Sequence, residues 1–370
     1  MMTEDLCDAL DESLSWRHER VELVHDADSG LQAAIAIHST ALGPALGGLR
    51  LRRYDGGLPE ALDDALRLSR AMTLKASAAG LDLGGGKAVV LDDGAWTDPA
   101  RRAARLRAFA REVERLGGAY ITAEDIGTST ADMDLLAEHT HHVVGTTRSA
   151  TLGGDPSPST ARTVLGAIAV AFDVLDGDDA LAGRSVGVIG LGKVGGRLAE
   201  LLVAAGARVV GADPDAAACE RARARGVELA ATAAELLSRP LDVLAPCAVG
   251  GMIDARTAAT VRCRVVCGSA NNALADERAA AQLARRDVLS VPDFLANCGG
   301  LIQADCERRR VADRARLEQA LDDARERTRA VLLEARGDGR LPSAVAEQHA
   351  WSRVRAARRR RAEPQAAAAA

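Results

Sequence analysis

The feature that most constrains the fold of this chain is a glycine-rich segment, Gly190-Leu191-Gly192-Lys193-Val194-Gly195. It follows an apolar run at residues 185–189 that predicts a buried strand, and it precedes a stretch at 197–205 with the apolar period of a helix. A second predicted strand, residues 208–212, ends at Asp213. Strand, glycine loop, helix and strand in this order form a βαβ unit. The segment therefore predicts an α/β fold built on a parallel sheet.

The same segment predicts what this unit binds. Its glycines let the backbone approach a pyrophosphate, whose charge the N-terminus of the following helix stabilises. Asp213, 23 residues after Gly190, is placed to accept hydrogen bonds from ribose hydroxyls, and its carboxylate repels a 2′-phosphate. We therefore predict a Rossmann domain that binds NAD rather than NADP, with Lys193 as a phosphate-side or surface cation. The alternative is a glycine-rich turn beside a structural aspartate.

Lysine is rare in this chain. Only Lys75, Lys87 and Lys193 occur, although lysine and arginine together number 47. An exposed ion pair accepts either cation, whereas an amine that transfers protons needs a pKa that burial can lower. Lys75 ends a predicted helix and Lys87 begins a predicted buried strand. We interpret these two lysines as a catalytic pair; a structural ion pair with Asp125 is the alternative.

Asp125 follows a predicted strand at residues 119–122. The carboxyl ends of strands are where α/β sheets place their functional groups. Asp125 is therefore a candidate for proton transfer. Two alternatives remain open: Asp125 only caps a turn, or its neighbour Glu124 takes the role.

Composition limits the class of protein. A chain of 370 residues is long enough for two domains, and a net charge of −5 with acids and bases interspersed argues against nucleic-acid binding. We expect no membrane span, because no stretch reaches about 20 apolar residues. The seven cysteines lack paired zinc spacing and indicate reduced thiols without a metal site. Since the first residues show no signal-peptide pattern either, we expect a cytoplasmic protein.

Further motifs stand in order along the chain: Gly43-Pro44-Ala45-Leu46-Gly47-Gly48, Met72-Thr73-Leu74-Lys75, Gly84-Gly85-Gly86-Lys87, Thr122-Ala123-Glu124-Asp125-Ile126-Gly127, Gly154-Asp155-Pro156-Ser157-Pro158, Ala245-Pro246-Cys247-Ala248 and Gly268-Ser269-Ala270-Asn271-Asn272. With these motifs the chain resembles the NAD-dependent amino-acid dehydrogenases of the glutamate, leucine, phenylalanine and valine type, most closely the leucine and valine enzymes. The resemblance covers about residues 21–307. It implies an α/β protein of two domains, an N-terminal substrate domain and a Rossmann NAD-binding domain, with the active site in the cleft between them.

The domain boundaries follow from this resemblance and from a turn-rich segment before residue 160. Residues 1–150 are expected to form the substrate, catalytic and oligomerisation domain, joined by a C-terminal helix at about 338–360. Residues 151–337 are expected to form the NAD-binding domain, and 361–370 a disordered tail. The resemblance also implies a homo-oligomer, either a dimer or an octamer.

The resemblance further implies roles for individual residues. Lys75 pairs with the α-carboxylate of the substrate, Lys87 activates water, and Asp125 exchanges protons with the amino group. Gly47 and Gly48 let the backbone come close to the substrate. The other implied substrate-binding residues are Leu46, Ala123, Asn271, Asn272, Leu301 and Ala304. The cofactor-binding residues are Thr160, Gly190, Leu191, Gly192, Lys193, Val194, Gly195, Asp213 and Asn271.

Leu46 narrows the expected substrate. Members of the family that act on glutamate carry a lysine at this position, and an unpaired buried charge costs roughly 2–7 kcal/mol. Glutamate is therefore disfavoured, and apolar Ala123, Leu301 and Ala304 are expected to complete the side-chain pocket. The expected reaction is the reversible oxidative deamination of valine or leucine to the 2-oxo acid, ammonia and NADH.

Four residues depart from the pattern of the leucine and valine enzymes, namely Leu49, Leu74, Ala76 and Val144. They predict an altered pocket wall and leave a shifted substrate range open. Two other functions also stay open: a dehydrogenase of the phenylalanine or tryptophan type, and a catalytically idle paralogue that binds NAD.

Overall fold

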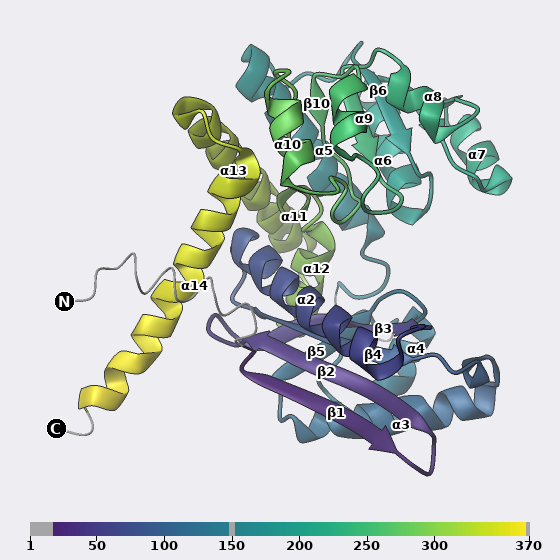
Figure 1. Ribbon diagram of the computed structural model, residues 1–370, viewed down its shortest axis with the longest axis vertical. Coiled ribbons are helices and arrows are strands. Elements are labelled where there is room, and N and C mark those ends of the chain that lie inside the picture. The colour runs from purple at the N-terminus through teal and green to yellow at the C-terminus, as the bar shows by residue number, and fades with distance from the viewer. Residues whose placement is uncertain (1–17, 148–151, 368–370) are drawn as a thin grey trace. The chain divides into compact units, whose positions relative to one another are not determined.

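The computed structural model describes residues 18–147 and 152–367 (Figure 1). The remaining residues, which include Cys7 and the last part of the predicted tail, lie outside the described part of the chain. The chain divides into two compact units. The first unit comprises Met1–Ser77, Asp82–Ser149 and Val354–Ala370, and the second comprises Ala78–Leu81 and Ala150–Arg353.

The first unit is built on a mixed sheet with the strand order β1-β2-β4-β3-β5. Its strands are β1 (Arg20–Asp26), β2 (Leu31–Ser39), β3 (Ala45–Arg52), β4 (Gly84–Leu91) and β5 (Tyr120–Glu124). The pairs β1–β2 and β2–β4 are antiparallel, whereas β3 runs parallel to both β4 and β5. The carboxyl ends of β3, β4 and β5 therefore meet at one edge of the sheet.

Side-chain alternation along the strands gives this sheet two buried faces. The helices of the unit are α2 (Gly57–Ala78), α3 (Pro99–Arg115) and α4 (Thr130–Leu136), with a short 3₁₀ helix η1 (Ala95–Thr97). Ile35 of β2 lies in one core cluster with Phe109 of α3. Ala34 and Ala36 of the same strand lie in another cluster with Ala65 of α2. One face of the sheet thus belongs to α2 and the other to α3 and α4.

The second unit has a parallel sheet with the strand order β11-β10-β9-β6-β7-β8. Its strands are β6 (Ser185–Ile189), β7 (Arg208–Ala212), β8 (Glu228–Leu229), β9 (Val243–Pro246), β10 (Val265–Val266) and β11 (Leu289–Ser290). From β6 the chain continues to β7 and β8 on one side, then returns to β9 on the other side of β6. This reversal is the topological switch point at which open α/β sheets bind ligands, and it confirms the predicted Rossmann fold.

Helices cover both faces of the parallel sheet. They are α5 (Ser157–Asp176), α6 (Lys193–Ala204), α7 (Ala216–Arg223), α8 (Ala233–Ser238), α9 (Ala255–Thr260), α10 (Glu277–Ala284), α11 (Asp293–Ala296), α12 (Gly299–Arg308) and α13 (Arg314–Asp338). Val188 of β6 shares a core cluster with Phe172 of α5. Its neighbour Ile189 shares the opposite cluster with Leu283 of α10. The prediction for the helix after the glycine loop was wrong at its start, because α6 begins at Lys193 and takes the end of the loop into its first turn.

Helix α5 is long and apolar enough to cross a membrane by length and composition, but 61% of its most apolar window is buried inside the protein. Burial of this kind is typical of a core helix.

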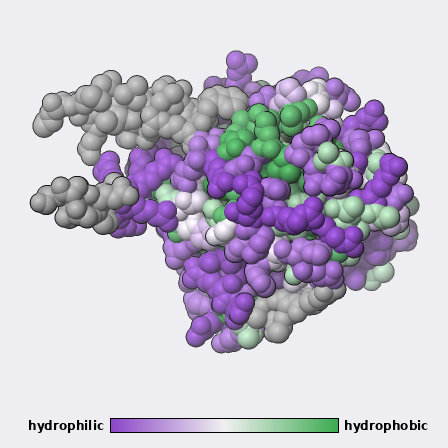
Figure 2. All heavy atoms as spheres, turned by 90° about the horizontal axis from the view of Figure 1, so that it is seen from below, coloured by the Kyte–Doolittle hydropathy of each residue, from purple (hydrophilic) through white to green (hydrophobic). Residues whose placement is uncertain are grey.

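The face in Figure 2 is mostly hydrophilic, and hydrophobic residues gather over one limited region of it.

The last helix, α14 (Pro342–Ala367), belongs to both units. Arg353 donates to the carbonyl of Leu81 over 2.6 Å within the second unit. Within the next turn Val354 and Ala357 are buried, and Arg358 donates to Ser39 Oγ of the first unit. The helix extends past residue 360, where the sequence predicts its end.

Candidate active site

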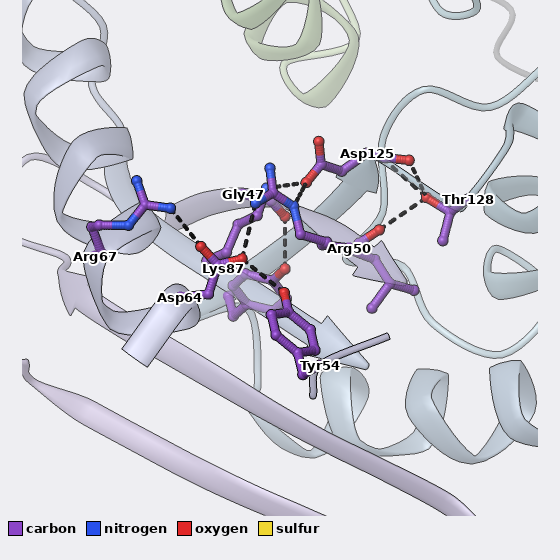
Figure 3. A network of polar contacts seen from close by, with 10 residues as sticks. Gly47, Arg50, Tyr54, Asp64, Arg67, Lys87, Asp125 and Thr128 are labelled. Atoms are coloured by element: carbon purple, nitrogen blue, oxygen red, sulfur yellow. Dashed lines mark hydrogen bonds and ion pairs between the residues drawn. The ribbon is translucent and has the colours of Figure 1, made fainter. Parts of the chain in front are cut away.

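The pairing of the strands explains which predicted residues of the first unit come together. Ala88 of β4 and Leu49 of β3 face α3, so their neighbours Lys87 and Arg50 face α2. Leu49 pairs with Glu124 of β5, which places Asp125 at the level of Arg50. Three charged side chains, from β3, from β4 and from the residue that follows β5, therefore gather on the α2 face (Figure 3).

Lys87 and Asp125 form a direct ion pair. Lys87 Nζ lies 2.5 Å from Asp125 Oδ2, and the lysine side chain is only 7% exposed. Burial lowers the pKa of Lys87, and the charge of Arg50 lowers it further against the attraction of Asp125. Burial alone would raise the pKa of Asp125, but Lys87 and Arg50 outweigh it and hold that pKa below its ordinary value. The pair thus combines a destabilised ammonium with a stabilised carboxylate.

The loop after β5 holds Asp125 rigidly. Thr128 Oγ1 accepts a hydrogen bond from the Asp125 N–H over 3.0 Å and donates to the Leu49 carbonyl over 2.9 Å. The carbonyl of Ile126 accepts from the Leu51 N–H. These hydrogen bonds attach the loop to β3 and hold the backbone of Asp125 in place.

Glycines at positions 47 and 48 allow this close packing. A Cβ on Gly48 would lie 2.7 Å from the Cβ of Asp125, and one on Gly47 would lie 1.7 Å from the Gly86 carbonyl oxygen. The buried hydroxyl of Tyr120 donates to the Gly47 carbonyl over 2.6 Å. Both glycines are thus required by the packing of β3, whatever their contact with a substrate.

Other predicted substrate-binding residues fall in both units. Leu46 is buried on β3 with 2% exposure and lies on the same face as Gly48 and Arg50. Ala123 pairs with Gly48, and Lys75 is half-buried in the last turn of α2. Leu301 and Ala304 lie on α12 of the second unit, as part of its own fold.

Sequence reasoning missed Arg50 and the residues that hold it. Arg50 bridges two carboxylates, Asp125 and Asp64, and Asp64 also accepts from Tyr54 and Arg67. The spacing of Arg50 from Gly48 would be a signal only once β3 is known to be a strand, because alternate residues of a strand share one face.

The glycine loop of the second unit is ordered around Asp213. Oδ2 of Asp213 accepts from the Leu191 N–H over 2.7 Å, and Oδ1 accepts from the Asp215 N–H over 2.8 Å. A carboxylate oxygen has two lone pairs, so each one can still accept a ribose hydroxyl. Gly190 has φ of +98°, and a Cβ on Gly195 would lie 1.9 Å from the Gly190 carbonyl oxygen.

Gly192 differs from the other two loop glycines, because a Cβ there would meet open space at the start of α6. This is the point at which a pyrophosphate can approach the helix N-terminus. The loop therefore fits the predicted dinucleotide.

Two predicted asparagines lie after β10. Asn271 Oδ1 accepts from Asn297 Nδ2 over 2.8 Å, and the Asn272 N–H donates to Asp293 over 2.5 Å. Asn297 is buried and was not predicted. Thr160 lies on α5, whose start packs closely on α12, because a Cβ on Gly300 would lie 2.9 Å from Thr160 Oγ1.

Gly192→Ala is expected to weaken NAD binding by roughly tenfold, since the added methyl group would occupy the space through which the pyrophosphate approaches the protein backbone. The fold has room for this methyl group, so the melting temperature should stay the same. Fluorescence titration with NADH and thermal denaturation measure the two effects. Gly195→Ala is the comparison, and its expected result is a loss of stability. Unchanged NADH affinity of Gly192→Ala would contradict the assignment of this loop.

Within the described ranges, no group of three or more His, Cys, Asp and Glu side chains is placed to hold a metal ion. The six cysteines that the structure describes are free thiols. The Lys87–Asp125 pair is placed for proton transfer.

Models of known protein families match three segments of the chain. Residues 18–142 match the model of the Glu/Leu/Phe/Val dehydrogenase dimerisation domain, and residues 216–361 match that of Glutamate/Leucine/Phenylalanine/Valine dehydrogenase. Residues 174–249 match the NAD-binding domain of D-isomer specific 2-hydroxyacid dehydrogenases.

Individual proteins are similar over most of their length. The chain is 41% identical to a valine dehydrogenase of Streptomyces virginiae, over 92% of this chain and 95% of that one. It is 40% identical to a leucine dehydrogenase of Thermoactinomyces intermedius over 286 residues, which are 77% of this chain and 77% of that one. The crystal structure of L-tryptophan dehydrogenase from Nostoc punctiforme superposes with a TM-score of 0.80 at 31% identity, over 94% of this chain and 99% of that one.

Proposed function

The chain belongs to the Glu/Leu/Phe/Val dehydrogenase family, and we propose that it catalyses the reversible, NAD-dependent oxidative deamination of a branched-chain L-amino acid. The products are the 2-oxo acid, ammonia and NADH. The observation that carries the proposal is the buried amine of Lys87 in contact with the carboxylate of Asp125.

Lys87 is the base of the proposed reaction. Loss of hydride from Cα leaves an iminium group, which water must attack before ammonia can depart. A neutral amine can take the proton of this water. Because burial and Arg50 lower the pKa of Lys87, a larger fraction of the amine is neutral at a given pH.

Asp125 exchanges protons with the substrate nitrogen. As a carboxylate it takes a proton from the substrate ammonium, which frees the nitrogen lone pair, and it returns a proton to the departing amine. Figure 3 shows one oxygen of Asp125 on Lys87 and Arg50 and the other pointing away from both. The glycine loop would hold NAD, whose nicotinamide would supply the acceptor for the hydride. Lys75 is proposed to bind the α-carboxylate, and Asn271 and Asn272 to orient substrate and nicotinamide.

The substrate side chain is proposed to be that of valine or leucine. Leu46 is buried and apolar, and it offers no charge to a glutamate side chain. The relatives named valine and leucine dehydrogenase support the same substrate class. One methylene changes selectivity by only about 1–3 kcal/mol, so both substrates belong in the test.

We also propose a homo-oligomer that works in the cytoplasm. The family model that matches residues 18–142 is that of a dimerisation domain. Strand β1 lies at the end of its sheet and exposes Val21 and Leu23, and a second copy could cover such an apolar edge. The free thiols of the described cysteines suit a reducing compartment.

The test is the formation of NADH from NAD at alkaline pH with a panel of Val, Leu, Ile, Phe, Trp, Ala and Glu. Turnover is expected with Val or Leu and not with Glu. Preference for Phe or Trp would replace the branched-chain assignment by an aromatic one. No turnover on any of these substrates, with NADH still bound, would instead support an idle paralogue.

A further inference from the structure

Arg50 lies between the catalytic carboxylate and a second carboxylate. Its Nε donates to Asp125 Oδ2 over 3.0 Å, and its Nη1 donates to Asp64 Oδ2 over 2.9 Å. The Arg50 side chain is only 13% exposed. A guanidinium group is planar and rigid, so two carboxylates at two of its nitrogens fix both its position and its plane.

Asp64 is itself held firmly on α2. Its Oδ2 accepts from the Tyr54 hydroxyl over 2.7 Å, and its Oδ1 accepts from Arg67 Nη2 over 2.6 Å. The side chain of Asp64 is 9% exposed. The chain of contacts therefore runs from the exposed Arg67 through Asp64 and Arg50 to Asp125, as Figure 3 shows.

The proposed reaction creates a charge problem at this pair. Lys87 has to be neutral when it takes a proton from water, and at that moment it no longer balances the charge of Asp125. A partly buried carboxylate without a cation tends to become protonated. If Lys87 were the only cation, the two groups would share one proton and titrate as a coupled pair.

We propose that Arg50 is a positioning residue that keeps Asp125 ionised and in place while Lys87 is neutral, so that the lysine and the aspartate change protonation separately. The guanidinium is suited to this because it does not lose its proton in proteins. Asp64 holds the guanidinium of Arg50 within hydrogen-bonding distance of Asp125 and balances part of its positive charge. This role rests on the proposed function.

Ionisable groups from several elements surround the pair. Arg50 of β3 lowers the pKa of Lys87, while Asp64 of α2 raises it. Burial raises the pKa of Tyr120 on β5, which therefore stays neutral. Burial alone would lower the pKa of Arg50, but Asp125 and Asp64 outweigh it and raise that pKa. Arg50 is thus the fixed charge of the group.

The test compares the pH dependence of kcat/KM for amino-acid oxidation in the wild type and in Arg50→Gln. The acid limb reports the deprotonation of Lys87. Without the positive charge of Arg50, the pKa of Lys87 rises, so this limb should move to higher pH by about one unit. Asp64 keeps Tyr54 and Arg67 as partners in this variant, and Asp125 keeps Lys87.

Arg105→Gln is the matched control. Arg105 is also a buried arginine of the first unit, and it donates twice to a carboxylate, Asp93, over 2.7 Å in each case. This control should lose thermal stability without any movement of the acid limb. If Arg50→Gln behaves in the same way, with lower stability and an unmoved limb, Arg50 is a structural residue and the proposal is wrong.

If Arg50→Gln does not fold, Arg50→Lys tests the proposed role of Arg50 instead. It retains the charge but cannot reach both carboxylates, so the acid limb should stay in place while kcat falls roughly 10- to 100-fold. Wild-type kcat in Arg50→Lys, or an acid limb moved upward, would overturn the proposal. A wild-type enzyme that oxidises no amino acid would instead refute the proposed function, which separates the two failures.

Discussion

Lys87→Ala is expected to lower kcat for amino-acid oxidation by roughly 10²- to 10⁴-fold, the range that a general base contributes. The amine of Lys87 is buried and contacts Asp125, so a base from bulk solvent does not reach its position directly. NADH affinity, measured by fluorescence titration, should stay unchanged because the glycine loop belongs to the second unit. Steady-state formation of NADH measures kcat.

Lys87→Arg distinguishes the base from the charge. Arginine retains the positive charge beside Asp125 but cannot give up its proton, so this variant should be as inactive as Lys87→Ala. Activity within tenfold of the wild type in either variant would remove Lys87 from the role of base.

Asp125→Asn is expected to lower kcat by a similar factor, roughly 10²- to 10⁴-fold, because the amide cannot accept the proton of the substrate ammonium. A second effect has the opposite sign to that of Arg50→Gln. Asp125 raises the pKa of Lys87, so its neutralisation lowers that pKa. The acid limb of kcat/KM should therefore move to lower pH while the maximal rate falls.

Glu124→Gln is the control for this prediction. Glu124 accepts a hydrogen bond from Thr130 Oγ1 over 2.8 Å, and strand alternation points it to the opposite face from Asp125. Near-wild-type activity is expected. A larger loss in Glu124→Gln than in Asp125→Asn would exchange the roles of the two carboxylates.

The residues that sequence could identify are those with a local signal. Lys87 is conspicuous because lysine is rare, and the glycine loop stands between a strand and a helix. Arg50 has no such signal, since it is one of 44 arginines, the 47 basic residues less the three lysines. Strand β3 itself is not predicted, because Gly47 and Gly48 interrupt its apolar alternation.

The rest of the site depends on contacts between distant segments. The Arg50–Asp64 pair requires α2 to pack on β3, and the Arg50–Asp125 pair requires β5 to pair with β3. These contacts join residues up to 75 positions apart. Strand order and register decide which of many charged residues meet. A local sequence pattern contains neither the order nor the register.

The division of α14 between the two units has a consequence for folding during synthesis. Lys87 and Asp125 lie in the unit that includes Val354–Ala370, whereas nearly all of the other unit comes from the continuous stretch Ala150–Arg353. A ribosome therefore releases the whole cofactor-loop unit before the last segment of the unit that bears Lys87. The cofactor-loop unit can therefore fold first, while the unit that bears Lys87 still lacks its segment Val354–Ala370.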